Sequence, residues 1–329
     1  MEFVIGSINM YKFSRQKDKE ISKDYAKIAK VICDEEFDVV ALQEVFNEYA
    51  VKSLVRDYLK PNWDYVWEAP TSRSQQAAEG YAFIWNTRRF RLATGIKKDE
   101  QNGNASDEKA HRRFMPRIHS QYDPDQFLFQ GKLIRDPLYA RFESIYGWYE
   151  LRLINTHIMY NDTKTDDDEG EKDKRRRELE ILMDIYHQIE SKKYRNDRVA
   201  YTFLLGDYNL SIKDISKLEN VDRNRSNDFE VYKIITDRNN EKQSIITVQH
   251  ELSTLKKSPP ADPQNSEEVF ANNFDHFTFS EEMKIERKVD MQYARVDSVN
   301  DSRYWDGDVQ AHRKEFSDHV PIKLAGSFK

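Results

Sequence analysis

The sequence has one cysteine and no long apolar run, and both absences exclude classes of protein. Cys33 is the only cysteine among 329 residues, so the chain forms no internal disulfide and no zinc site built from several thiolates. No apolar stretch approaches the roughly 18 residues that indicate a membrane span. A basic segment followed by an apolar one, the mark of a signal peptide, is also missing at the start. We therefore expect a cytoplasmic protein without a membrane span.

The charge balance is acidic. The charged fraction is 33% and the formal net charge is −6, which is typical of a strongly solvated globular protein. This balance argues against a generic binder of polyanions, because the phosphate backbone rewards clustered Lys and Arg. It is compatible with a hydrolase whose site holds several carboxylates for a cation and which carries local basic patches.

Apolar patterns predict both strands and helices along the chain. The spacing predicts helices over 19–34 and 171–192, and compact apolar runs predict strands over 2–9, 38–42 and 199–205. Strands occur both between helices and in runs, which favours an α+β sandwich with mixed sheets. No linker is visible, so we expect one domain over 1–329, with insertions near 97–126 and 221–273.

One stretch directly after the predicted strand 199–205 is rich in polar groups. Gly206 ends that apolar run, and Asp207 and Asn209 follow it two positions apart. In extended backbone, residues i and i+2 point the same way, so these two side chains would project together. A carboxylate beside a carboxamide suits a metal-bound phosphate. The same residues are typical of an Asx turn that closes a strand, and the sequence leaves both interpretations open.

Polar groups close several other predicted strands. Asn9 ends the first strand, Glu44 the second and His157 a middle one; Asp275 lies in a late strand, and Ser317-Asp318-His319 precedes the last. Each has an ordinary explanation, such as a turn for Asn9, a helix cap for Glu44 or a satisfied buried histidine for His157. Together they favour a site, because unrelated caps have no reason to supply only metal, phosphate and proton-transfer groups.

The ordered set of motifs resembles the endonuclease/exonuclease/phosphatase superfamily, most closely its deoxyribonuclease I-like branch. The resemblance rests on motifs that span nearly the whole chain, namely Ile8-Asn9-Met10, Leu42-Gln43-Glu44-Val45, Asn155-Thr156-His157, Gly206-Asp207-Tyr208-Asn209 and Ser317-Asp318-His319. It implies a four-layer α/β/β/α sandwich, with two packed mixed β-sheets and helices outside. It also implies that the site lies at one end of the sandwich, where strand ends converge.

The resemblance implies a metal and phosphate site. Glu44 is similar to the principal ligand of a divalent cation, with Asn9 and Asp318 near it. Asp207 and Asn209 would position the phosphate or complete a second metal position. The cation implied is Mg²⁺, with Mn²⁺ or Ca²⁺ as alternatives.

The resemblance also implies two histidine–carboxylate pairs. His319 resembles the general base that draws a proton from the attacking water, and Asp275 the carboxylate that orients its imidazole. His157 resembles a second histidine that donates to a phosphate oxygen or assists the leaving oxygen. Its carboxylate partner would be Glu79.

Three further positions bear on the substrate. Arg135, in Ile134-Arg135-Asp136-Pro137, resembles an arginine that reaches a backbone phosphate. Phe46 stands where the branch often has an arginine, and Ala77 stands where it can have an aromatic that contacts DNA. These two departures concern how DNA would be gripped rather than the chemistry.

The expected function is that of a metal-dependent phosphodiesterase, and DNA is its expected substrate. The leading hypothesis is a DNA endonuclease or nickase that hydrolyses phosphodiester bonds by in-line attack of activated water. A first alternative is a phosphatase or phosphodiesterase of the same superfamily that acts on a lipid head group, an inositol phosphate or a nucleotide. A second alternative is a binding protein that keeps the fold without turnover. The sequence indicates no protein partner.

Overall fold

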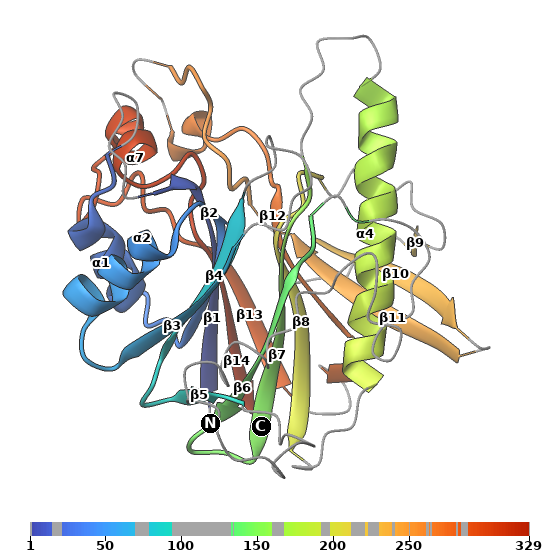
Figure 1. Ribbon diagram of the computed structural model, residues 1–329. Helices are drawn as coiled ribbons and strands as arrows, with labels where there is room; N and C mark the ends of the chain where they lie inside the picture. The colour runs from blue at the N-terminus through green and yellow to red at the C-terminus, as the bar shows by residue number, and fades with distance from the viewer. Residues whose placement is uncertain are drawn as a thin grey trace.

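Two β-sheets lie face to face at the centre of the molecule, and helices cover their outer faces (Figure 1). The computed structural model describes residues 2–14, 22–69, 79–93, 133, 135–159, 168–191, 198–211, 221–222, 230–238, 241–249, 251–260, 263, 265–280, 282–283 and 289–328.

A six-stranded sheet contains the N- and C-terminal strands. Its spatial order is β13 (Val289–Arg295), β14 (Ile322–Phe328), β1 (Glu2–Phe13), β2 (Val39–Val45), β4 (Gly80–Asn86) and β3 (Trp63–Glu68). The β1–β2 pair is parallel and the other neighbours are antiparallel. Because a parallel pair aligns the carboxyl ends of its strands, Asn9 pairs with Gln43, the residue before Glu44.

An eight-stranded sheet packs against the first. Its spatial order is β5 (Phe90–Leu92), β6 (Leu138–Ser144), β7 (Tyr149–His157), β8 (Val199–Asp207), β12 (Asp275–Ser280), β11 (Glu241–Gln249), β10 (Glu230–Arg238) and β9 (Val221–Asp222). The β7–β8 pair is parallel, and its register sets His157 beside Asp207. The antiparallel β12 sets Asp275 on the other side of Asp207.

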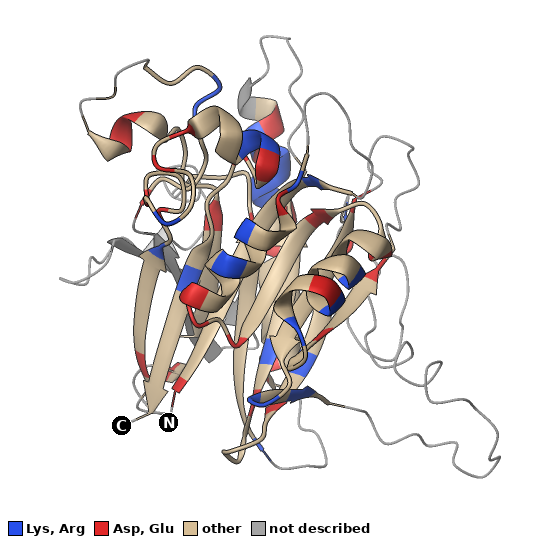
Figure 2. Ribbon diagram, turned by 90° about the vertical axis from the view of Figure 1, so that its left-hand side faces the viewer, with Lys and Arg blue, Asp and Glu red and all other residues tan. Residues whose placement is uncertain are grey.

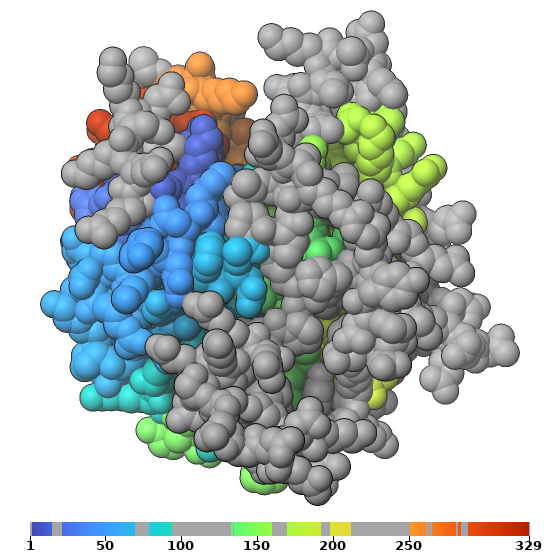
Figure 3. All heavy atoms as spheres, viewed as in Figure 1, coloured from blue at the N-terminus to red at the C-terminus, as the bar shows by residue number. Residues whose placement is uncertain are grey.

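The helices form the two outer layers. On the six-stranded sheet lie α1 (Tyr25–Asp34), α2 (Glu48–Ser53), the π-helix η1 (Leu54–Leu59) and α7 (Val309–Glu315). The long α4 (Asp168–Ser191) covers the eight-stranded sheet. The space-filling view in the same orientation shows the blue N-terminal residues on one side and α4 on the other (Figure 3). No helix in the described ranges is long and apolar enough to cross a membrane.

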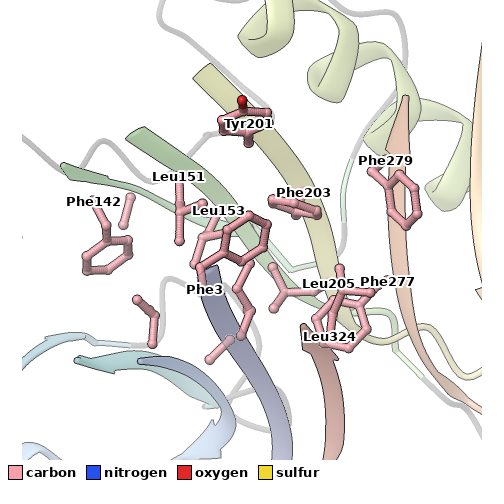
Figure 4. Close-up of a cluster of buried hydrophobic side chains, with 14 of the residues drawn as sticks. Phe3, Phe142, Leu151, Leu153, Tyr201, Phe203, Leu205, Phe277, Phe279 and Leu324 are labelled. Carbon is pink, nitrogen blue, oxygen red and sulfur yellow. The ribbon is translucent and has the colours of Figure 1, made fainter. Parts of the chain in front are cut away.

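Aromatic and aliphatic side chains fill the space between the sheets (Figure 4). Phe3 of β1 meets Phe203 of β8 edge to face, with ring centroids 5.8 Å apart. Leu153 and Leu324 pack in the same buried cluster. Each such side chain contributes about 1.5–3 kcal/mol when it leaves water. This core holds the two sheets in fixed register, and the polar ends of their strands stand at its edge.

The four-layer α+β sandwich that the resemblance implied is confirmed. The predicted helix 19–34 begins later, at Tyr25, because Asp24 caps it by accepting from the Lys27 backbone N–H at 3.0 Å. The range 221–273 is not simply an insertion loop, because it contains β9, β10, β11 and the 3₁₀ helix η3 (Ser266–Val269). Short runs of β-branched residues, Ile234-Ile235-Thr236 and Ile245-Ile246-Thr247-Val248, were the signal for strands there. The insertion at 97–126 lies outside the described residues, and the single-domain assignment stays a prediction.

Candidate active site

The polar strand ends of the two sheets meet around one carboxylate oxygen, Oδ2 of Asp207. The Asn9 side-chain amide donates to this oxygen at 3.0 Å and to Oε1 of Glu44 at 3.1 Å. Nε2 of His157 lies 3.5 Å from it and Nε2 of His319 lies 3.7 Å from it. Five residues that are up to 310 positions apart in the chain, Asn9 to His319, thus form one cluster. Asn9 joins the two sheets because it bonds to a carboxylate from each.

The backbone at Gly206 explains how Asp207 reaches this place. Gly206 has φ 138°, a conformation that L residues rarely adopt. A Cβ at this position would stand 1.9 Å from the carbonyl oxygen of Thr156 on β7. Glycine therefore lets β8 approach β7 closely at the point where the site begins.

His319 and Asp275 form the first histidine–carboxylate pair. Nδ1 of His319 donates to Oδ2 of Asp275 at 2.7 Å, which leaves Nε2 facing Asp207. Burial alone would lower the pKa of His319, but the charges of Asp275 and Asp207 outweigh burial and raise that pKa well above its ordinary value. The contact with Asp275 therefore fixes the orientation of the imidazole and keeps its Nε2 toward Asp207.

His157 and Glu79 form the second pair, and Arg135 completes it. Nδ1 of His157 lies 2.8 Å from Oε2 of Glu79, and Nη2 of Arg135 donates to Oε1 of the same carboxylate at 2.9 Å. Burial favours a raised pKa for Glu79, but the contacts with His157 and Arg135 outweigh it and lower the pKa. Nε and Nη1 of Arg135 are also buried, and they have no hydrogen-bond partner among the residues that the structure describes.

Glu44 heads the residues that suit a divalent cation. One ligand atom from each of Glu44, Glu79 and His157 lies within 4.8 Å of the others, and the same holds for Asp207, Asp275 and His319. Burial, together with the nearby carboxylates of Glu79 and Asp318, raises the pKa of Glu44. A bound dication would offset this crowding of negative charge. Hard oxygen donors of this kind fit Mg²⁺ or Mn²⁺.

Strained backbone aims Glu44 at the site. Its φ is 56°, which is uncommon outside glycine. Its neighbour Gln43 points into the interior, where its side chain donates to Asn155 Oδ1 at 2.7 Å. The alternation of an ordinary strand would turn Glu44 toward the opposite face. Left-handed backbone costs of order 1–3 kcal/mol and is a feature of functional sites.

Two predicted residues sit differently from the simplest expectation. Asn209 has φ 48°, its N–H donates to Oδ1 of Asp207 at 2.8 Å, and its side-chain amide donates to the Ile158 carbonyl at 2.8 Å. The Asn209 N–H thus closes an Asx turn with Asp207, which is one of the two interpretations of the sequence. This turn fixes the Asp207 carboxylate. Asp318 contacts Arg313 Nη2 at 3.4 Å, outside both groups of candidate ligands, although its charge reaches Glu44.

The segment 251–256 supports the first pair and was not singled out in the sequence. Ser253 Oγ donates to Oδ2 of Asp275 at 2.6 Å. Thr254 pairs with His319 through the backbone, and Leu255 N–H donates to the Asp318 carbonyl at 2.8 Å. A serine in a polar stretch carries no signal of such a role, because only the fold sets it beside Asp275.

His312 of α7 supports the same turn from the other side. Its Nδ1 donates to the Ser317 carbonyl at 2.7 Å, and its Nε2 accepts from Ser298 Oγ at 2.8 Å. Ser317 Oγ in turn donates to the Asn9 carbonyl at 2.6 Å and accepts from the His319 N–H at 3.0 Å. The turn before β14 is therefore fixed to β1 and α7.

Ala77, the other departure noted in the sequence, lies outside the described residues.

Two mixed sheets with helices outside, and a polar site where strand ends meet, define the fold of the endonuclease/exonuclease/phosphatase superfamily, so the resemblance is confirmed at the level of fold. The sequence matches no family model and no curated protein sequence.

Solved structures resemble the chain over its whole length. An endonuclease/exonuclease/phosphatase family protein from Bacteroides thetaiotaomicron is 15% identical, with 100% of this chain and 98% of that chain covered and a TM-score of 0.53. TDP2 from D. rerio, complexed with single strand DNA product, is 14% identical, with 99% of each chain covered and a TM-score of 0.51. The human Nocturnin catalytic domain with bound sulfate anion is 12% identical, with 100% and 95% covered and a TM-score of 0.53. At these identities the likeness shows the fold alone.

Proposed function

We propose that this protein is a divalent-metal-dependent phosphodiesterase that acts on DNA, as an endonuclease or nickase. The observation that carries the proposal is the convergence of two histidine–carboxylate pairs on Asp207, with His157 Nε2 at 3.5 Å and His319 Nε2 at 3.7 Å. Such an arrangement supplies one histidine that can take a proton from water and a second that can donate to a phosphate oxygen, both next to the Asp207 carboxylate.

The roles follow from the contacts. His319 takes the proton of the attacking water at Nε2, and Asp275 stabilises the imidazolium that forms, since it accepts from Nδ1 at 2.7 Å. Glu44 and Asp207 would hold the cation, with the Asn9 amide donating to both carboxylates, and the cation would supply positive charge to the phosphate. Offsetting the negative charge around His319 in this way lowers its pKa toward the range where the imidazole accepts a proton.

Arg135 and His157 are the phosphate contacts. Two buried nitrogens of Arg135 have no partner among the described residues, and an acceptor such as a phosphate oxygen would satisfy them. His157 presents Nε2 to the same region while Glu79 holds its other nitrogen.

One observation supports DNA as the substrate, and a second supports a phosphate-like ligand in general. The similar TDP2 was solved with a single strand DNA product, and the similar Nocturnin domain holds a sulfate anion. On the side covered by α1 and α2, Lys and Arg alternate with Asp and Glu (Figure 2). That mixed surface does not favour indiscriminate polyanion binding, so the DNA contact is assigned to the site itself.

Plasmid nicking tests the proposal. Supercoiled DNA with Mg²⁺ should become nicked in the presence of the wild-type protein and not of His319→Ala, with EDTA abolishing the reaction. A panel of lipid, inositol and nucleotide phosphates run in parallel detects the alternative substrates. Hydrolysis of one of those with intact plasmid would replace DNA as the substrate. If no ester is hydrolysed and Glu44→Ala keeps the wild-type affinity for the metal, the chain is a binding protein.

A further inference from the structure

Two aromatic residues stand at the edge of the six-stranded sheet, directly beyond the site. Tyr11 follows Asn9 by two residues on β1, and Phe46 follows Glu44 by two residues after β2. The two strands are parallel neighbours, so their carboxyl ends lie at the same edge of the sheet. On its other side β2 pairs with β4, and Glu79 directly precedes the first residue of β4.

A bulge in β1 presents Tyr11. The pairing of β1 with β2 shifts register between Asn9 and Phe13, and Tyr11 and Lys12 have φ of 43° and 56°. Their backbone N–H groups are used on the site, with Tyr11 donating to Asn9 Oδ1 and Lys12 donating to Glu44 Oε2, each at 3.0 Å. The bulge therefore ties the backbone of Tyr11 and Lys12 to two site residues.

The backbone of Phe46 is also fixed by a hydrogen bond, and its side chain is more exposed than that of Tyr11. Val45 before it is fully buried against the helices, and its partner across the sheet is Gly80, the residue after Glu79. The Phe46 N–H donates to the Phe13 carbonyl at 2.9 Å, and the side chain is 37% exposed. The protein therefore covers only part of the Phe46 ring, and the rest is open to solvent beside the site.

Positive charge lies next to the aromatic on β1. Nζ of Lys12 is 5.3 Å from the Tyr11 ring centroid, and Nζ of Lys23, which donates to the Met10 and Phe316 carbonyls, is 5.7 Å from it. Lys12 is exposed. Aromatic rings interleaved with cations are the means by which proteins bind the bases and the backbone of an unpaired strand.

We propose that Tyr11 and Phe46 are a stacking site for the bases of a single-stranded stretch of nucleic acid whose phosphate enters the site at Glu44. The inference rests on the proposed function and narrows its substrate to unpaired nucleotides. The face of an aromatic ring stacks on any base that is out of a duplex. Base pairing would withdraw that face from the ring.

The test compares three labelled DNA substrates of equal length, namely a single strand, the same strand in a duplex, and a strand of abasic spacers. Wild-type protein should prefer the base-bearing single strand over both others. In Phe46→Ala and Tyr11→Ala the preference over the abasic strand should fall by about 5- to 100-fold each, the range for loss of one stacked base. Phe46→Leu keeps an apolar side chain but has no flat ring. Its preference for the base-bearing strand over the abasic strand should fall by a similar factor.

Tyr146→Ala is the matched control, because Tyr146 is 67% exposed and lies in the turn at the far end of β7 from His157. It should keep the wild-type preference. The same ratios are measured as equilibrium affinity by fluorescence anisotropy in Ca²⁺, which needs no turnover. Equal affinity of the wild type for base-bearing and abasic strands, or unchanged ratios in both alanine variants, would overturn the stacking site. Strand-selective binding without hydrolysis in Mg²⁺ would uphold it and refute the proposed activity.

Discussion

The two histidine–carboxylate pairs have nearly the same nitrogen–oxygen distance, but only His319 makes an aligned hydrogen bond to its carboxylate, and the surroundings of the pairs differ. His319 lies 2.7 Å from its carboxylate and His157 lies 2.8 Å from its own. Neutral Ser253 holds the carboxylate of the first pair, whereas the cation Arg135 holds that of the second. Burial opposes a raised pKa at both histidines, but at His157 the charge of Arg135 opposes it as well. The pKa of His319 therefore depends on the negative charges around it, which suits a base whose protonation must change. Charges of both signs act on His157, which suits a donor whose protonation stays the same.

A third histidine shows what burial does without carboxylates. His312 is fully buried between Ser298 and the Ser317 carbonyl, and burial lowers its pKa to about 3. The raised pKa values of His157 and His319 thus come from the neighbouring carboxylates and not from their depth in the protein.

The largest effect that separates the two pairs is expected from removing each carboxylate charge. Asp275→Asn should lower kcat by about 10²- to 10⁴-fold, because an amide neither stabilises the imidazolium nor secures the tautomer with a free Nε2. Glu79→Gln should lower kcat/KM by about 10- to 100-fold, the value of a hydrogen bond to a charged group. It should also lower the pKa of His157, because only the charge of Asp207 then opposes that of Arg135 at this ring.

Steady-state cleavage of a DNA oligonucleotide at saturating Mg²⁺ measures both constants, and histidine NMR measures the pKa. Thermal melting of each variant serves as the control for folding. Losses in kcat within threefold of each other would show that the two pairs do the same work.

A smaller effect is expected from His312, and it acts on stability. In the folded protein its pKa is about 3, below the ordinary value of 6.5. Below pH 6.5 the unfolded chain takes up a proton that the folded chain does not. Stability from this residue is therefore complete above about pH 7 and decreases as the pH falls, by about 2 kcal/mol at pH 5.

Urea unfolding of the wild type and of His312→Gln, compared from pH 8 to pH 5, isolates this contribution. The glutamine can still bond Ser317 and Ser298, but it has no proton to take up. The difference in the free energy of unfolding should be constant above pH 7 and should move by about 2 kcal/mol in favour of the variant at pH 5. A difference that stays level over the whole range would mean that His312 is protonated in the folded state.

The sequence was most informative where strands end. Asn9, Glu44, Asp207 and His319 each follow or precede an apolar run, so their place at a sheet edge could be predicted before any contact was known. The side chain of Asn209 could not be placed, because the i, i+2 rule assumes extended backbone and Asn209 has φ 48°.

Contacts between segments that are far apart in the chain could not be predicted from the sequence. Glu79 and Arg135 are 56 positions apart, and nothing local to either marks their ion pair. The strands over 230–249 show a different failure, since their runs of β-branched residues were present but were outweighed by the polar, proline-containing stretch that follows. Supporting residues are the least predictable, because their role depends on a contact and not on their chemical type.

Ser253 is the clearest supporting residue, and the smallest effect is expected from it. Ser253→Ala removes one of two donors to Oδ2 of Asp275, where His319 is the other. The carboxylate then rotates more freely and the imidazole is less firmly aimed, so kcat should fall about 2- to 10-fold, as for one neutral hydrogen bond, while KM stays level. Ser253→Thr should restore kcat because it keeps the hydroxyl, and this rescue distinguishes positioning from a mere packing role. If alanine and threonine lower kcat equally, the hydroxyl does not position the pair, and the difference between the two histidines rests on Arg135 alone.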